Sequence, residues 1–429
     1  MREIDVQETN EKIYQEKLSN GLDVYMYPTN KEGFELYLTT RYGGKHLEFK
    51  LKNEKEYHKI PYGVAHFLEH ITFHMDGYDI DSLFAPYGAD INAFTSFDST
   101  CYYVGNNKNF KECLETLLFY VYTPYYTKET VEHEKGIIKE ERKRADDNVE
   151  RVIYQIRNES LLHNSYYKGS VLGTLDEIDS ITLDDINHAY NTFYNPSNMF
   201  LVISGKFDKD EALEIVKNKM NEFNFDNNEI DVKVPYEPET VVDEYKEVKL
   251  KVLDERVLYS FKIPRKVVEK TGLSYFEYAN YLSNILDINF GSTSLYYEKL
   301  LKNDIAIYNS NTYFSLYDDY IILLISNKVK KGKKDEFIKL TEECMNNLSV
   351  TDKEIKRKYK CLFADQILQF DDYKYVSNIL NYELNTFGEF NPDFLPIMKK
   401  FNKEIADKII SNLDLSNKSI LVVLPENEK

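Results

Sequence analysis

The feature that most constrains this chain is a five-residue stretch, HFLEH, at residues 66–70. If the stretch is helical, His66 and His70 lie one above the other, because side chains four residues apart share a helix face. Two imidazoles in that arrangement can reach one zinc ion at the ~2.0–2.1 Å that zinc–nitrogen bonds require. Glu69 points a fraction of a turn away, close enough to handle a zinc-bound water without becoming a ligand. The alternative is a helix with two hydrogen-bonded histidines and a surface glutamate.

A zinc site of this kind needs a third protein ligand and keeps its fourth position for water. Glu134 and Glu141 are seven residues apart, so on a helix they share a face, with Ile137 and Ile138 between them. Carboxylates beside apolar residues indicate that at least one faces inward, where a buried carboxylate needs a partner such as a metal. The alternative is an ordinary charged amphipathic helix. The motif order, HxxEH, is the inverse of the commoner HExxH of zinc peptidases.

These motifs and their order resemble the pitrilysin/insulinase-type inverted zinc peptidases, which include mitochondrial processing peptidase and bacterial two-subunit relatives. The resemblance extends over nearly the whole chain, and several independent elements agree in order. Besides HxxEH, it covers an opening strand at residues 18–28, the residues 63–65 before the metal helix, a glycine turn and edge strand at 88–96, the helix around 134–141, and the closing segment at 194–205.

The resemblance implies a role for each motif residue. The implied ligands of one Zn²⁺ per chain are His66, His70 and Glu141. Glu69 would be the general base, which takes the proton of the attacking water and later delivers it to the leaving amine. Glu134 would be a supporting carboxylate that orients a ligand histidine or the base.

Two positions in these helices leave alternatives open. Glu140 competes with Glu141 for the ligand role, because either could face the metal if the helix register shifts; the family pattern favours Glu141. His74 continues the stripe of His66 and His70 by one further turn. We expect His74 to have a supporting or surface role, since the ligands already number three.

The edge strand would bind the substrate. An extended peptide would add a strand beside Asn92, Ala93, Phe94 and Thr95, with backbone hydrogen bonds giving affinity and side-chain pockets giving selectivity. The alternative is a sheet edge that is simply protected by a neighbouring loop.

The length of 429 residues predicts two domains. A polar, acidic, proline-bearing segment predicts a linker at 226–242, between an N-terminal zinc-binding catalytic domain, 1–225, and a C-terminal domain for substrate binding and dimerisation, 243–429. In the second half we expect a strand at 247–262, helices at 274–302, a strand at 320–326, long helices to about 407, and a closing strand at 419–425 that mirrors 201–205. The family resemblance implies an α+β fold of two homologous α/β-sandwich-type domains, each a mostly antiparallel sheet packed with helices.

The second half departs from the family pattern at one position. Relatives usually carry an arginine and, some dozen residues later, a tyrosine, which bind substrate and stabilise the oxyanion. Here Leu295 stands in place of the arginine, and no arginine occurs between Arg265 and Arg357. Tyr308 matches the tyrosine and is a candidate donor; alternatively, it is one of 36 tyrosines, packed in a sheet.

The missing arginine predicts a partner. A donor aimed at an oxyanion is worth ~3–4 kcal/mol in the barrier, so its loss alone should cripple a peptidase. In two-subunit relatives one chain carries the metal motif and its sister carries the arginine and tyrosine. We therefore expect the catalytic subunit of a heterodimer, a zinc endopeptidase that cleaves short or unfolded peptides in an enclosed chamber. The alternatives are a homodimeric peptidase and a zinc-binding but inactive partner or scaffold subunit.

Composition narrows the setting. The net charge of −18 argues against nucleic-acid binding and favours either basic peptide substrates or simple solubility. No apolar run reaches membrane-spanning length, and the acidic N-terminal residues show no signal or transit pattern, so we expect a cytoplasmic protein without a membrane partner. The four cysteines, at positions 101, 113, 344 and 361, show neither metal nor disulfide spacing. We expect reduced thiols.

Overall fold

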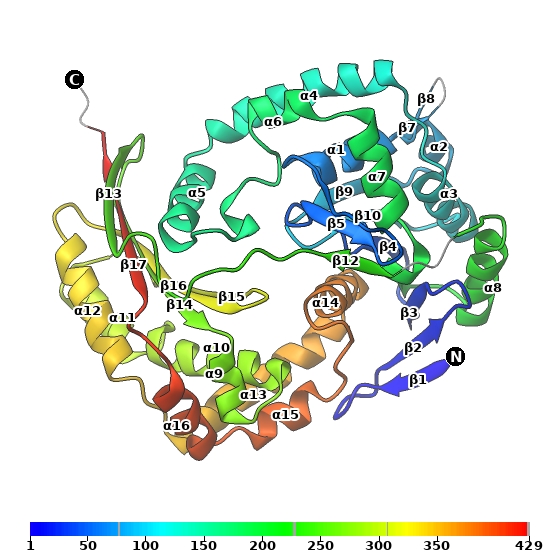
Figure 1. Cartoon of the computed structure of the whole chain (residues 1–429). Helices are drawn as coiled ribbons and strands as arrows, with labels where there is room; N and C mark the ends of the chain where they lie inside the picture. The colour runs from blue at the N-terminus through cyan, green and yellow to red at the C-terminus, as the bar shows by residue number, and fades with distance from the viewer. Residues whose placement is uncertain (76–77, 226–228, 307, 427–429) are drawn as a thin grey trace. The chain divides into compact units, whose positions relative to one another are not determined.

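The computed structural model describes residues 1–75, 78–225, 229–306 and 308–426 (Figure 1). The chain forms two compact units. Unit 1 consists of residues 1–145, 169–234 and 366–392, and unit 2 consists of residues 146–168, 235–365 and 393–429. Each unit is a sheet packed with helices, which confirms the predicted α+β class. No helix in the described ranges combines the length and the apolar composition that crossing a bilayer would require.

Unit 1 is built on a mixed sheet of seven strands. Adjacent strands in the sheet run antiparallel, except that β3 and β11 run parallel. The central strands β4 and β11 are buried along their whole length, as expected of strands covered on both faces. The strand order is β1 (Arg2–Asp5), β2 (Lys12–Lys17), β3 (Asp23–Pro28), β11 (Met199–Gly205), β4 (Phe34–Thr40), β10 (Thr100–Asn106) and β9 (Asp90–Thr95).

Helices cover both faces of this sheet. Successive strand residues point to opposite sides, so each face has its own set of apolar side chains to bury. Val24 and Met26 pack into the larger core, under the helices that carry the metal motif. Tyr25 and Tyr27 face the other way, toward α14 (Tyr373–Thr386). The helices that contribute to the larger core are α1 (Val64–Thr72), α2 (Asp81–Phe84), α3 (Phe110–Tyr122), α4 (Lys128–Asp146), α6 (Leu175–Ser180), α7 (Leu183–Phe193) and α8 (Lys209–Met220).

Two small sheets complete unit 1. The first has the order β12 (Ile230–Val232), β5 (Glu48–Leu51) and β6 (His58–Lys59), and the second pairs β7 (His74–Met75) with β8 (Tyr78–Asp79). β12 lies within the predicted linker, 226–242, so part of that segment is ordered structure. Residues 226–228 of the predicted linker lie outside the described residues.

Unit 2 repeats the strand order of unit 1. Its sheet runs β13 (Tyr245–Leu250), β17 (Lys418–Pro425), β14 (Glu255–Pro264), β16 (Tyr320–Val329) and β15 (Asn311–Leu316), and only β13 and β17 are parallel. The order β3-β11-β4-β10-β9 in unit 1 is the same: the first strand lies parallel to the last, and the second, fourth and third follow. This shared topology supports the predicted homology of the two domains. The strand predicted at 247–262 is instead two strands, β13 and β14, because the chain turns between them.

The helices of unit 2 pack on and around this sheet. Ile153 of α5 packs with Leu258, Leu324, Leu421 and Val423 of the strands. The helices are α5 (Val149–Leu161), α9 (Lys266–Thr271), α10 (Tyr275–Phe290), α11 (Leu295–Lys302), α12 (Lys334–Asn346), α13 (Asp352–Phe370, which continues into unit 1), α15 (Phe394–Lys400) and α16 (Lys403–Asn412). Three short 3₁₀ turns lie at Ala85–Tyr87, Tyr166–Lys168 and Pro196–Asn198.

The two units are not continuous in sequence. α5, from the first half of the chain, covers β14 and β17 of unit 2, while α14, from the second half, covers β4 and β11 of unit 1. The predicted division into 1–225 and 243–429 assumed continuous domains. An amphipathic pattern shows that a helix has an apolar face, but it does not show which sheet that face covers.

A buried ion pair anchors the C-terminal end of the predicted linker within unit 2. Glu237 is 7% exposed and accepts the backbone N–H groups of His163, Asn164 and Ser165 at 2.9, 2.7 and 2.7 Å. Its carboxylate also pairs with the ammonium group of Lys262, which is 1% exposed. Burial opposes ionisation of Glu237, but Lys262 and the three N–H groups hold the pKa of this carboxyl below its ordinary value.

We expect Glu237→Ala to lower the free energy of unfolding by ~3–5 kcal/mol, because it leaves the Lys262 ammonium buried without its partner. Urea unfolding followed by circular dichroism measures this change. The matched control is Glu239→Ala, which breaks an exposed ion pair with Lys266 and should cost at most ~1 kcal/mol. Equal losses in the two variants would contradict the role of Glu237.

Candidate metal centre

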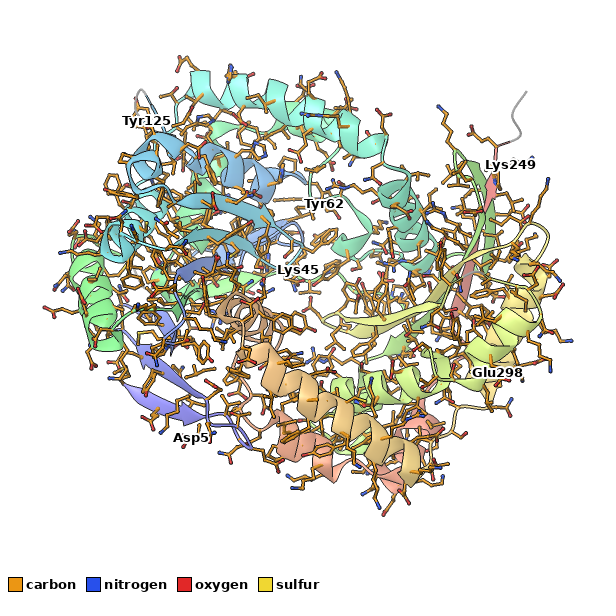
Figure 2. The ribbon with its side chains drawn as sticks, turned by 180° about the vertical axis from the view of Figure 1, so that it is seen from behind. Asp5, Lys45, Tyr62, Tyr125, Lys249 and Glu298 are labelled. Atoms are coloured by element: carbon orange, nitrogen blue, oxygen red, sulfur yellow. The ribbon has the colours of Figure 1, made fainter. Side chains whose placement is uncertain are left out.

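The start of α1 places the HFLEH residues. Gly63 precedes the helix with a φ of 95°, in the left-handed region that glycine adopts most readily. A Cβ atom at Gly63 would also lie 2.7 Å from the carbonyl oxygen of Leu172. Tyr62, labelled in Figure 2, packs so closely on Gly169 that a Cβ there would lie 2.3 Å from its ring. The chain around 169–173 therefore fixes where α1 begins.

The two histidines of the motif share one face of α1. Phe67, Leu68 and Ile71 are fully buried and hold the opposite face of the helix in the core. The rings of His66 and His70 lie with their centroids 4.5 Å apart. This is the arrangement that the four-residue spacing predicts.

Glu141, from α4, completes a group of three metal-ligating side chains. Its Oε2 atom lies 3.3 Å from Nε2 of His70 and 3.7 Å from Nε2 of His66. One ligand atom from each of the three residues lies within 4.8 Å of the others. Two atoms that each lie ~2.0–2.1 Å from a tetrahedral zinc ion are roughly 3.4 Å apart, so these donors fit Zn²⁺.

Glu140 does not join this group. It is exposed and binds the Lys143 ammonium at 2.6 Å, which lowers its pKa. The register of α4 is set by burial, since Glu134 and Ile138 lie on the inner face with exposures of 2% and 1%. Glu141 lies seven residues after Glu134 on that face, so the alternative in which Glu140 is the ligand is not what the structure shows.

Glu134 contacts two histidines at the centre and orients one of the candidate ligands. Its Oε1 atom accepts a hydrogen bond from Nδ1 of His70 at 2.8 Å, and its Oε2 atom lies 2.9 Å from Nε2 of His74. Burial opposes ionisation of Glu134, but the two histidines outweigh it and lower the pKa of this carboxyl to about 2. With a proton on Nδ1, His70 directs the lone pair of Nε2 toward Glu141.

The same hydrogen bonds affect the basicity of His70. Burial opposes its protonation, but Glu134 and Glu141 together raise its pKa to about 9. A proton and a metal ion compete for Nε2, so binding of zinc at this nitrogen would release a proton. The carboxylates that stabilise the imidazolium also make this imidazole a stronger ligand.

The position of His74 differs from the sequence expectation. α1 ends at Thr72, so His74 lies in β7 and does not extend the helical stripe. It reaches Glu134 with one ring nitrogen and Asp79, at 3.1 Å, with the other. Its contact with Glu134 raises the pKa of His74. This contact fits the supporting role that we expected, although His74 makes it from β7 and not from α1.

Glu69 lies beside the ligands and contacts the edge strand. The hydroxyl group of Thr95, in β9, donates a hydrogen bond to Oε2 of Glu69 at 2.5 Å. Burial raises the pKa of Glu69, although Thr95 and His70 partly offset this effect. A carboxylate with a raised pKa is a better proton acceptor near neutral pH. Sequence reasoning placed Thr95 on the substrate strand but gave no sign of this contact.

β9 is the edge strand of the seven-stranded sheet and packs beside α1 (Figure 1). Its residues alternate between exposed and half-buried, with Asn92 and the 40% exposed Phe94 outward and Ala93 and Thr95 inward. In the described residues only β10 pairs with it. Binding of an extended peptide along its other side stays a prediction.

The predicted residues of the second half belong to unit 2. The side chain of Tyr308 is 66% exposed, which does not fit the alternative of a tyrosine packed in the sheet. Its carbonyl group accepts a hydrogen bond from Asn327. Leu295 is the first residue of α11 and is 75% exposed. The preceding Ile307 lies outside the described residues, and a catalytic role of Tyr308 stays a prediction.

Comparisons with known proteins agree with the geometry. The family model "Insulinase (Peptidase family M16)" matches residues 54–175, and "Peptidase M16 inactive domain" matches residues 180–360. The zinc protease YmfH of Bacillus subtilis is 35% identical over 304 residues, which cover 70% of this chain and 70% of that protein. The mitochondrial-processing peptidase subunit beta of Bos taurus is 28% identical over 160 residues, 36% of this chain and 33% of that protein. A crystal structure of an M16-like peptidase from Alicyclobacillus acidocaldarius matches with a TM-score of 0.90 at 26% identity and covers 98% of this chain and 100% of that one.

We expect Glu141→Gln to weaken zinc binding by more than the ~10–100-fold that is typical when a residue that only orients a ligand is lost. Competition with a chromophoric zinc chelator measures the affinity. Glu140→Gln is the matched control, since it removes the neighbouring charge on the exposed face and should leave the affinity unchanged. The opposite ranking of the two variants would reverse the ligand assignment.

Proposed function

The chain belongs to the insulinase family of peptidases, peptidase family M16, and on this premise we propose that it is a zinc-dependent endopeptidase acting on short or unfolded peptides. The observation that carries the proposal is the meeting of His66, His70 and Glu141, with Glu69 beside them. Bound zinc would supply a Lewis acid that polarises a peptide carbonyl and acidifies water.

The protein's own residues divide the remaining work. Thr95 holds Oε2 of Glu69, which leaves Oε1 to accept a proton from the attacking water. As the carbon–nitrogen bond of the substrate breaks, Glu69 passes that proton to the leaving amine nitrogen. Glu134 keeps the proton of His70 on Nδ1 throughout, so that Nε2 stays a ligand.

The substrate backbone would lie along β9. A peptide in extended conformation can pair with the open side of this edge strand and bring its carbonyl groups past Glu69, because Thr95 at the end of β9 contacts that residue. The proposal favours substrates without stable structure of their own, since a folded protein cannot donate a single extended strand without unfolding locally.

We further propose that catalysis depends on a sister subunit of similar fold. The support is the exposed Leu295, where relatives usually have an arginine, since the sequence has no arginine between Arg265 and Arg357. Such a sister chain would supply the missing oxyanion donor. A homodimer is the less favoured alternative, because a second copy would bring a second leucine.

Replacement of Glu69 by Gln should lower the cleavage rate by ~10²–10⁴-fold, because the amide cannot accept the proton of water. Zinc should stay bound, since Glu69 is not a ligand. Hydrolysis of a quenched fluorescent peptide in the presence of the sister chain measures the first effect, and the zinc content of the purified variant measures the second. Glu132→Gln, a change at an exposed carboxylate of α4, is the control and should retain both properties. Loss of zinc from the Glu69 variant would contradict its assignment as the base.

Partner dependence is tested by mixing. We expect purified, zinc-loaded chain to leave a quenched basic peptide intact and to cleave it when the sister chain is added. Cleavage by the chain alone at ordinary rates would disprove the dependence. Bound zinc without cleavage in either sample would favour the alternative of an inactive partner subunit.

A further inference from the structure

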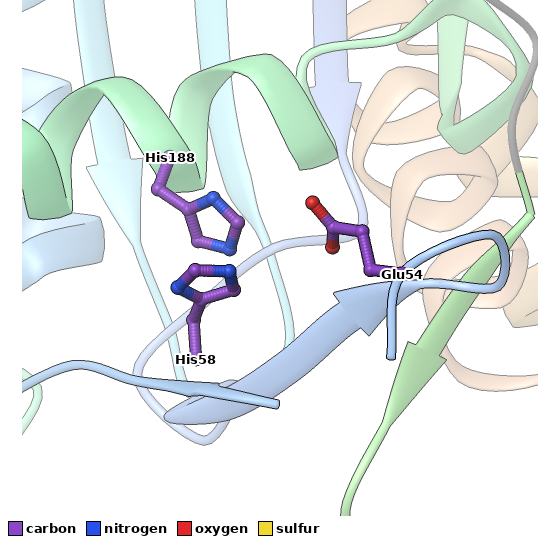
Figure 3. A group of neighbouring side chains, drawn as sticks. All are labelled: Glu54, His58 and His188. Carbon is purple, nitrogen blue, oxygen red and sulfur yellow. The ribbon is translucent and has the colours of Figure 1, made fainter. Parts of the chain in front are cut away.

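A second group of metal-ligating side chains lies in unit 1, with no residue in common with the first. It consists of Glu54, His58 and His188 (Figure 3), and one donor atom of each lies within 4.8 Å of the others. Glu54 lies in the turn that follows β5, His58 is in β6, and His188 is in α7. The donor set, two imidazoles and one carboxylate, is the same as in the first centre.

The two imidazoles lie close together, with their rings tilted. The ring centroids of His58 and His188 are 3.7 Å apart, with an angle of 43° between the rings. His188 also stacks on the fully buried Phe49, with the ring centroids 5.1 Å apart and an angle of 11° between the rings. α7 itself starts at a capping box formed by Thr182 and Asp185, so His188 is carried on a well-anchored helix. Figure 3 shows the carboxylate of Glu54 turned toward both rings.

One donor atom in this group lacks a hydrogen-bond partner. Nε2 of His188 is buried, and within the described parts of the chain nothing donates to it or accepts from it. Buried polar atoms are nearly always paired, so such an atom needs an explanation, and an unplaced ion is one.

The carboxylate of Glu54 is held in position by hydrogen bonds within its own turn. Its Oε2 atom accepts the backbone N–H of Leu51 at 2.7 Å, and the N–H of Glu54 donates to the carbonyl of Leu51 at 2.9 Å. These two bonds close the turn after β5 and fix the carboxylate in place. Its other oxygen can then bind an ion without a large loss of side-chain freedom.

We propose that Glu54, His58 and His188 form a second site for a divalent transition-metal ion, with Zn²⁺ as the expected occupant. Two imidazoles disfavour Ca²⁺ and Mg²⁺, which prefer oxygen ligands. The site binds more weakly than the first, because His58 is exposed and, among the described residues, neither imidazole is hydrogen-bonded to a carboxylate as His70 is to Glu134. An ion here ties the β5–β6 segment to α7, which packs against α1, the helix of His66 and His70.

The test counts ions on the full chain after removal of metal with a chelator. Zinc is titrated by calorimetry, and Co²⁺ is titrated with detection of its visible absorption bands. We expect wild type to bind two ions with separable affinities, and His58→Ala to bind only the tighter one. Glu141→Gln should lose the tighter ion and keep the weaker one, so the two sites are distinguished without any measurement of cleavage.

A matched control removes a different exposed imidazole. His133, on α4, belongs to neither group, so His133→Ala should still bind two ions. Because His58 is exposed, its replacement should leave the metal-free melting temperature unchanged, which separates loss of the site from loss of the fold. Binding of a single ion by wild type, or of two ions by His58→Ala, would overturn the proposal.

Discussion

The candidate metal centre depends on the burial of one carboxylate. Glu134 is 2% exposed, and a charge so far from water must be compensated by close partners. His70 and His74 provide them, one for each oxygen atom. This pairing fixes α4 against α1, and the same helix face then carries Glu141 to the two imidazoles two turns later. Alignment of the ligands is therefore a consequence of how a buried charge is neutralised.

Sequence patterns predicted the relative positions of residues that lie close together in the chain. His66 and His70 share a face because helix geometry is local, and Glu141 follows Glu134 for the same reason. The contacts of Thr95 with Glu69 and of His74 with Glu134 join separate elements, and no periodicity reports them. The helix that would have carried His74 ends at Thr72, and the sequence has no Gly or Pro at that point to indicate the helix end.

The same distinction applies to the fold. The α+β class followed from the family resemblance. Apolar and alternating runs predicted strands such as β16 and β17, because such runs reflect burial along each element. Such patterns could not show which sheet α5 and α14 cover, since the apolar face of a helix fits either of two similar sheets. The group of Glu54, His58 and His188 has no motif either, as it joins a turn, a short strand and a helix more than a hundred residues further along.

The exchange of α5 and α14 has a consequence for how this chain can be divided. A fragment that stops at residue 225 contains both candidate metal groups but lacks α14, so the sheet face with Tyr25, Tyr27 and Phe200 would meet water. An uncovered apolar sheet face of this kind promotes aggregation. The complementary fragment lacks α5 and leaves Leu258 and Leu421 uncovered. The two halves resemble each other as folds, yet each compact unit takes segments from both halves of the sequence, so we expect neither half to fold stably without the other.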